Sequence, residues 1–183
     1  MSILTNKVFV GHAFIALGSN LAGDLDCPAS QVTRGFQSIE KIVKTKLIKR
    51  SSLYQSAPVG YANQPDFINA VVEISTQLSP QALLDALLTI ENEAGRERPF
   101  ANAPRELDLD LLLFDDEIMD TAKLTLPHPR MFERGFVLLP LAEISPNLTL
   151  NFTLPKHGSI VKLAEAYKNQ GIKKIENGKN SDF

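Results

Sequence analysis

The order in which strand-like and helix-like hydrophobic patterns follow one another constrains the fold of this chain more than any other feature. Alternating apolar residues, or short continuous apolar runs, predict strands over residues 7–17, 47–54, 67–76 and 107–114. Apolar residues three and four positions apart predict helices over 30–44 and 79–95, the second with Ser79 as N-cap and Pro80 at its first position. This order is typical of an α+β, ferredoxin-like fold, with a mostly antiparallel sheet and helices packed on one face of it.

The rest of the chain carries weaker patterns. A polar turn at 115–117 leads into a short strand that ends at Leu126, and helical spacing returns over 136–143 and 159–167. The chain has 183 residues, which is enough for one domain spanning 1–183. We expect its two ends, residues 1–6 and the polar stretch 168–183, to fray.

Charge and cysteine content narrow the class of protein. Nineteen Lys and Arg against 21 Asp and Glu leave a net charge of −2, too balanced for a protein whose main partner is nucleic acid or an anionic membrane. No segment approaches the roughly 18 apolar residues of a membrane span. The single Cys27 can form neither an internal disulfide nor a typical structural zinc site. These features favour a cytoplasmic protein with small-molecule partners, which we expect to be a monomer.

Two aspartates interrupt the apolar strand at 107–114. Asp108 and Asp110 are two residues apart, so both side chains leave the same face of the strand, about 7 Å apart along the chain. A divalent cation relieves the repulsion between two such carboxylates, and hard oxygen ligands suit Mg²⁺. Alternatively the two aspartates are simply solvated on an exposed face, and the spacing alone does not decide between these interpretations.

Basic residues gather on both sides of this strand. Five of the seven arginines lie there, together with Lys123 and His128: Arg96, Arg98, Arg105, Arg130 and Arg134. A metal-binding acidic pair among guanidinium groups is the arrangement that phosphoryl transfer needs. Any single arginine could instead form an ordinary salt bridge, for example with Glu97, Glu106 or Glu133. His128, between two prolines, is either a phosphate donor or a surface imidazole.

A third group of residues suits a flat heterocycle. Asn69 follows Phe67 in a predicted strand, where an amide must find hydrogen-bond partners, and Phe136 follows the basic cluster. An amide beside aromatic rings can recognise the polar edge of a planar ring system. The alternatives are core packing for Phe67 and Phe136 and a backbone-capping role for Asn69.

Four stretches in register give the chain a resemblance to a known family. They are residues 14–21 (FIALGSNL), 64–70 (QPDFINA), 95–112 (with GRER and PRELDLDLL) and 126–136 (LPHPRM followed by RGF). Together they resemble the 6-hydroxymethyl-7,8-dihydropterin pyrophosphokinases of folate biosynthesis, from about Phe14 to Pro146. The resemblance implies a ferredoxin-like fold, ATP and two Mg²⁺ ions. It also implies transfer of pyrophosphate from ATP to the hydroxymethyl group of the pterin, leaving AMP.

The resemblance also implies roles for individual residues. It places both Mg²⁺ ions on Asp108 and Asp110, and catalytic phosphate contacts on Arg96 and Arg105. The implied ATP contacts are Glu91, Arg98, Lys123, Thr125, His128 and Arg134. The pterin would lie between Phe67 and Phe136, with Asn69 at its polar edge and the backbone from Ser56 through Ala57 to Val59 closing the pocket.

The segment 96–104 departs from the family pattern. Several relatives carry a basic residue and a Trp before the aspartates, whereas the corresponding positions here are Ala101 and Asn102, and the chain has no Trp. We expect this segment to act as a lid that orders over both substrates, with Phe100 as a substitute aromatic. Two other functions fit the same motifs: a Mg²⁺-dependent nucleotide transferase with a different acceptor, and a catalytically silent relative that only binds.

Overall fold

The computed structural model describes residues 10–60, 63–95, 103–149 and 159–175. Its elements are, in chain order, β1 Gly11–Ser19, α1 Pro28–Glu40, β2 Thr45–Arg50, β3 Tyr54–Ser56, β4 Phe67–Thr76, α2 Pro80–Glu93, β5 Asp108–Phe114, β6 Met119–Asp120, β7 Thr125–Leu126, the 3-10 turn η1 Met131–Glu133, α3 Gly135–Ile144, α4 Ile160–Glu165 and β8 Lys173–Lys174. The Ser79 hydroxyl accepts a hydrogen bond from the Ala82 amide, so Ser79 is the N-cap of α2, as predicted.

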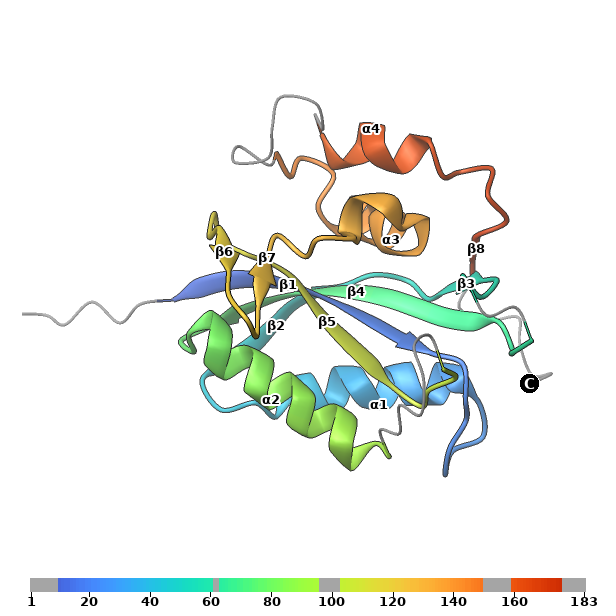
Figure 1. Ribbon diagram of the computed structural model, residues 1–183, viewed down its shortest axis with the longest axis horizontal. Helices are drawn as coiled ribbons and strands as arrows, with labels where there is room; N and C mark the ends of the chain where they lie inside the picture. The colour runs from blue at the N-terminus through green and yellow to red at the C-terminus, as the bar shows by residue number, and fades with distance from the viewer. Residues whose placement is uncertain (1–9, 61–62, 96–102, 150–158, 176–183) are drawn as a thin grey trace, which may run out of the picture.

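The main sheet is antiparallel throughout. Its strands lie in the order β5-β1-β4-β3-β8, and β2 also pairs with β4. The predicted α+β, ferredoxin-like arrangement is therefore confirmed (Figure 1). A separate two-stranded ribbon, β6 with β7, follows β5 and includes the short strand expected to end at Leu126.

The strand predicted over 47–54 is two strands in the structure. β2 ends at Arg50 and β3 begins at Tyr54, both paired with β4. Between them the Ser51 hydroxyl accepts a hydrogen bond from the Val71 amide at 3.0 Å and donates one to the Ser52 carbonyl at 2.7 Å. The side chain thus replaces part of the backbone ladder, because a serine hydroxyl competes with backbone groups for the same partners.

Helices cover both faces of the sheet, so the expectation of one helical face is wrong. On one face α1 and α2 pack against Ile15, Ile74 and Leu111. On the other face α3 and α4 pack against Phe14 and Leu112 (Figure 1). The apolar runs in β1 and β5 are nearly continuous because both faces of these strands are buried. A strand buried on both faces does not alternate apolar and polar residues. Asp108 and Asp110 consequently lie at the edge of a second core rather than on an open face.

Of the two ends that were expected to fray, residues 1–6 and 176–183 lie outside the described residues, and only 168–175 are described. Lys173 and Lys174 form β8 and pair with Gln55 and Tyr54 of β3, and the Ile175 amide donates to the Leu53 carbonyl at 2.8 Å. The composition of this stretch is polar, but the unpaired edge of β3 offers it backbone partners. In the described part of the chain, no helix is long and apolar enough to cross a membrane.

Candidate active site

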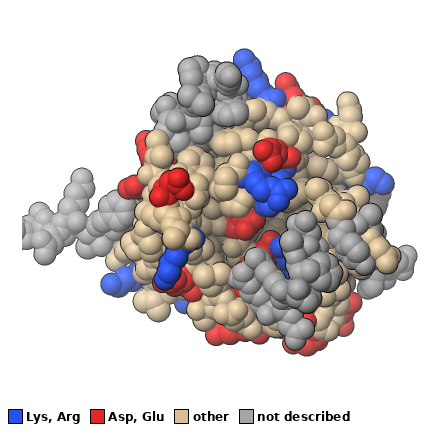
Figure 2. All heavy atoms as spheres, in the orientation of Figure 1, with Lys and Arg blue, Asp and Glu red and all other residues tan. Residues whose placement is uncertain are grey.

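A cavity of about 330 Å³ opens where the ends of four strands meet the start of α3. Asp108 and Asp110 lie on β5, at one end of the sheet order, and Ser56 lies on β3, with β1 and β4 between the two strands. Phe67 of β4 and Phe136 of α3 are among the remaining walls. Figure 2 shows a hollow in this region of the surface, with acidic and basic side chains side by side. Both aspartates, two of the arginines predicted to contact phosphate or ATP and both predicted aromatic residues therefore share one cavity: Asp108, Asp110, Arg105, Arg134, Phe67 and Phe136.

Each aspartate at the charged end is paired with an arginine. Arg105 Nη1 donates to Asp108 Oδ2 at 2.8 Å, and Arg134 Nη1 donates to Asp110 Oδ2 at 2.9 Å. The side chains of Asp108 and Asp110 are 18% and 30% exposed, so both carboxylates still reach the cavity. The salt bridges foreseen as the alternative role for these two arginines do form, but with the aspartates rather than with Glu106 or Glu133.

The donor set at this end is compatible with Mg²⁺. Among the described residues no group of three or more His, Cys, Asp or Glu side chains gathers as a complete metal site. Mg²⁺ is usually held by one or two carboxylates together with substrate phosphates and water, because it gives up its water reluctantly. Two carboxylates that line an open cavity fit this requirement and do not fit a closed structural site.

His128 stands beside the same carboxylates. Burial lowers the pKa of His128 and nearby Arg134 lowers it further, while Asp110 opposes the shift. The ring is therefore neutral near pH 7. Its Nδ1 accepts the Arg130 amide at 3.2 Å, so the proton belongs on Nε2, which lies 3.8 Å from Asp110 Oδ2. His128 thus presents a neutral N–H donor at the charged end of the cavity.

Arg105 is anchored through its backbone. Its amide donates to Asn20 Oδ1 at 2.9 Å, and its carbonyl accepts the Asn20 amide at 3.1 Å. Its guanidinium carbon lies 5.7 Å from the centre of the Phe67 ring, a cation–π contact between the charged and aromatic parts of the cavity. The buried Nε of Arg105 has no hydrogen-bond partner among the described residues. Arg105 lines the cavity, and a guanidinium group there suits an anionic ligand.

Asn20 is a positioning residue that the sequence analysis missed. It is 1% exposed, and its Nδ2 donates to Gln64 Oε1 at 2.9 Å and to the Pro65 carbonyl at 3.2 Å. Through these bonds it joins the end of β1 to the loop before β4 and to Arg105. Asn20 stands in the family-resembling stretch 14–21, but as a polar residue directly after a buried strand it also suits an ordinary turn.

The aromatic end of the cavity contains most of the predicted pterin residues. Those that line it are Ser56, Ala57, Val59, Phe67 and Phe136. Asn69 is 5% exposed and lies behind this wall, where its Nδ2 donates to Ser56 Oγ at 2.9 Å. A Cβ added to Gly18 would lie 3.5 Å from Asn69 Oδ1, so the Asn69 amide lies next to Gly18, which itself lines the cavity.

A second cavity, of about 250 Å³, adjoins the first. The predicted ATP residues in its lining are Glu91, Lys123, Thr125 and His128, whereas Arg134 lines the first cavity. Asp110 lines both. Glu91 is 2% exposed and its Oε1 accepts the Leu109 amide at 2.8 Å, so it also fixes the backbone of β5 between the two aspartates. Arg96, Arg98, Phe100, Ala101 and Asn102, with most of the expected lid, lie outside the described residues.

Comparison with known proteins gives consistent results. A family model described as 7,8-dihydro-6-hydroxymethylpterin-pyrophosphokinase matches residues 14–146. The 2-amino-4-hydroxy-6-hydroxymethyldihydropteridine pyrophosphokinase of Pseudomonas aeruginosa is 40% identical over 166 residues, which cover 91% of this chain and 98% of the relative. The folic acid synthesis protein fol1 of Schizosaccharomyces pombe is 34% identical over 91% of this chain and 23% of its own length.

A solved structure has the same fold. The wild-type HPPK-DHPS of Plasmodium falciparum, crystallised with pteroate, superposes with a TM-score of 0.67 at 16% identity. The superposition covers 90% of this chain and 43% of the other, so this chain corresponds to less than half of that protein.

Proposed function

Because the chain belongs to the 7,8-dihydro-6-hydroxymethylpterin-pyrophosphokinase family, and is thus an ATP-using pyrophosphokinase of folate biosynthesis, we propose that its two adjoining cavities hold the two substrates. ATP binds in the cavity lined by Glu91, Lys123 and Thr125. The acceptor, 6-hydroxymethyl-7,8-dihydropterin, binds between Phe67 and Phe136. The observation that carries this proposal is the position of Asp110, which lines both cavities.

The charged end between the cavities suits pyrophosphate transfer. Asp108 and Asp110 would hold two Mg²⁺ ions, which when bound neutralise phosphate oxygens and withdraw electrons from the phosphorus. Arg105 and Arg134 each have further N–H groups besides the one that binds an aspartate, and these donors bind the polyphosphate. His128 donates its Nε2 proton to a phosphate oxygen as a neutral group. Charge stabilisation and positioning account for the catalysis, with no covalent nucleophile.

The acceptor slot has a polar and an apolar part. Phe67 and Phe136 provide aromatic surface for the pterin ring, and each lies within 6 Å of a guanidinium carbon. Asn69, which lies next to Gly18 of the cavity lining, accepts a hydrogen bond from the ring's N–H groups through its Oδ1. The proposed enzyme is a single domain that works as a monomer. The single cysteine and the charge balance support a cytoplasmic location.

The test is AMP release from ATP. We expect release with 6-hydroxymethyl-7,8-dihydropterin, none with a simple sugar as acceptor, and none after chelation of divalent cations, with recovery on addition of Mg²⁺. Release with the sugar alone would identify a transferase with another acceptor. Tight pterin binding without any AMP would identify a silent binding relative.

A further inference from the structure

The C-terminal segment, residues 167–175, reaches the acceptor slot. Gln170 and Ile172 line the same cavity as Phe67 and Phe136. Both lie beyond residue 146, where the match to the family model ends. Neither the motifs nor the family match assigns them a role.

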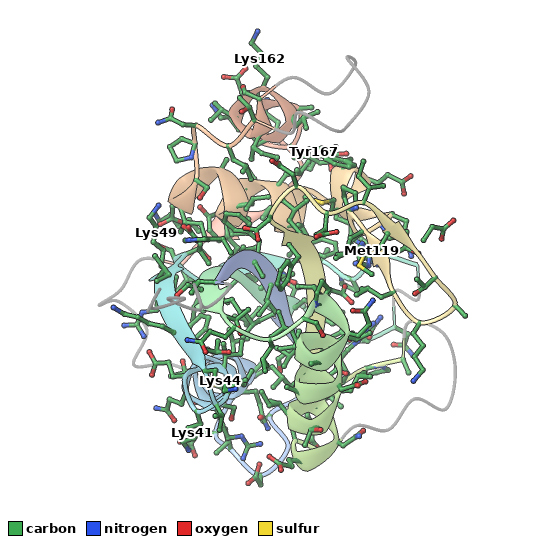
Figure 3. All side chains as sticks on the ribbon, turned by 90° about the vertical axis from the view of Figure 1, so that its left-hand side faces the viewer. Lys41, Lys44, Lys49, Met119, Lys162 and Tyr167 are labelled. Atoms are coloured by element: carbon green, nitrogen blue, oxygen red, sulfur yellow. The ribbon has the colours of Figure 1, made fainter. Side chains whose placement is uncertain are left out.

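Two sets of contacts hold this segment in place. At its start the Tyr167 ring packs on Gly135, so closely that a Cβ added there would lie 2.6 Å from the ring, and Tyr167 Oη donates to the Phe132 carbonyl at 3.1 Å. Figure 3 shows Tyr167 at the end of α4, on the side toward the rest of the molecule. Gly135 directly precedes Phe136, so the segment is anchored beside one wall of the slot.

At its end the segment is held by Glu143 of α3. This carboxylate accepts hydrogen bonds from Lys174 Nζ at 3.0 Å, from Tyr54 Oη at 2.8 Å and from Ser52 Oγ at 2.8 Å. The bonds join α3, β3 and β8 at one point. Between the two anchors Gly171 has φ of +73°, a left-handed conformation that favours glycine and turns the chain back toward β3.

The strand order places this segment at the acceptor end of the cavity. Tyr54 pairs with Lys174 and Gln55 with Lys173, so the next position along each strand brings Ile172 opposite Ser56. Ser56 is the residue whose hydroxyl accepts from Asn69. The aspartates are on β5, with β1 and β4 between them and β3. Ile172 is therefore remote from the phosphate end.

We propose that Ile172 and Gln170 form an additional wall of the acceptor slot and set its affinity for the flat bicyclic acceptor. This inference rests on the proposed function. Ile172, half-buried at the aromatic end, contacts the ring system, and Gln170 offers an amide donor and acceptor to its polar edge. The segment thereby determines acceptor recognition without touching ATP.

The decisive measurement is steady-state AMP formation with each substrate varied in turn. For Ile172→Ala we expect the KM of the pterin to rise roughly tenfold, the change typical of lost apolar contact in a pocket, with kcat and the KM of ATP unchanged. Ile172→Val should recover most of the loss. Gln170→Ala should raise the same KM by a smaller factor. Lys173→Ala, in the same strand but outside the cavity lining, is the matched control and should equal wild type.

The outcomes distinguish a failure of this inference from a failure of the proposed function on which it rests. A wild-type protein that releases no AMP overturns the proposed function and this inference with it. An active wild type whose pterin KM is unchanged in Ile172→Ala overturns the inference alone. Equal losses for ATP and pterin, or a loss that Lys173→Ala shares, would indicate a merely structural segment and overturn it too. Thermal unfolding of each variant checks that the fold is retained.

Discussion

Replacing Glu143 by alanine tests a carboxylate that accepts several hydrogen bonds and does not line the cavity. Besides the three side-chain donors described above, Glu143 accepts the Ser52 amide at 3.2 Å. Hydrogen bonds to charged groups contribute about 1.5–3 kcal/mol, and a buried donor left without its acceptor costs a similar amount. The Glu143 side chain is 27% exposed, so water compensates part of the loss. We therefore expect Glu143→Ala to lower the free energy of unfolding by about 2 kcal/mol, near the low end of that range.

The pH dependence of this effect has a definite sign. Burial alone would raise the pKa of Glu143, but the bonds from Lys174, Ser52 and Tyr54 outweigh it and hold the pKa below the usual 4.5. A carboxyl with a lowered folded pKa stabilises the protein above its unfolded pKa and loses that contribution as pH falls through the folded value. The difference between wild type and Glu143→Ala should be complete at pH 7 and shrink progressively below pH 4.5.

Urea unfolding at pH 7 and at pH 3 provides the measurement. At pH 7 the variant should also melt about 4–8 °C lower, since 1 kcal/mol corresponds to about 2–4 °C for a chain of this size. Amide exchange at Ile175, bonded to Leu53, should become faster. Glu165→Ala is the control, because Glu165 is 57% exposed and pairs only with Lys168 among the described contacts. A difference below about 0.5 kcal/mol at pH 7, or one equally large at pH 3, would refute the reasoning.

Four further outcomes are expected. Asp108→Ala and Asp110→Ala should each lower kcat at least about 100-fold with the circular dichroism spectrum retained. Asp116→Asn, in the turn after the same strand, should leave kcat unchanged. Asn69→Ala should weaken pterin binding by about 1–3 kcal/mol in calorimetry and leave ATP binding intact; equal losses would mean a structural role. Arg105→Ala should reduce both nucleotide affinity and turnover, and a normal ATP affinity would contradict that assignment. Burial raises the pKa of Tyr54 above the usual 10.0, so the stability that its hydroxyl contributes should be present below pH 10.0 and decline above it, while Tyr54→Phe should lack this decline in urea titrations.

Local pattern was sufficient to predict much of the fold. The alternation of periodicities gave the element order and the antiparallel sheet, and the two-residue spacing correctly put Asp108 and Asp110 on one side of β5. The second helical layer was foreseeable from the same strands. Phe14 of β1 is buried, and so are both of its neighbours in the strand. A run of consecutive buried residues is typical of a strand with a core on either side.

Long-range hydrogen bonds could not be predicted in this way. Asn20 bonds to a backbone amide 85 residues later, and Glu143 accepts from a tyrosine 89 residues earlier. Nothing near either residue in sequence signals such a partner, because the contact exists only after the strands have assembled. The strand in the polar C-terminal segment could not be predicted for a related reason. It forms by backbone pairing with β3, and amino-acid composition does not indicate such pairing.

Asp110 lines both cavities, so in the proposed arrangement we expect the binding of the two substrates to be linked. A ligand bound in one cavity changes the electrostatic environment of a carboxylate that also lines the other. Thermodynamic reciprocity then applies: the factor by which the nucleotide alters the acceptor's dissociation constant equals the factor by which the acceptor alters the nucleotide's. In a two-ligand binding cycle, Asp110→Asn should bring that common factor toward one from both directions.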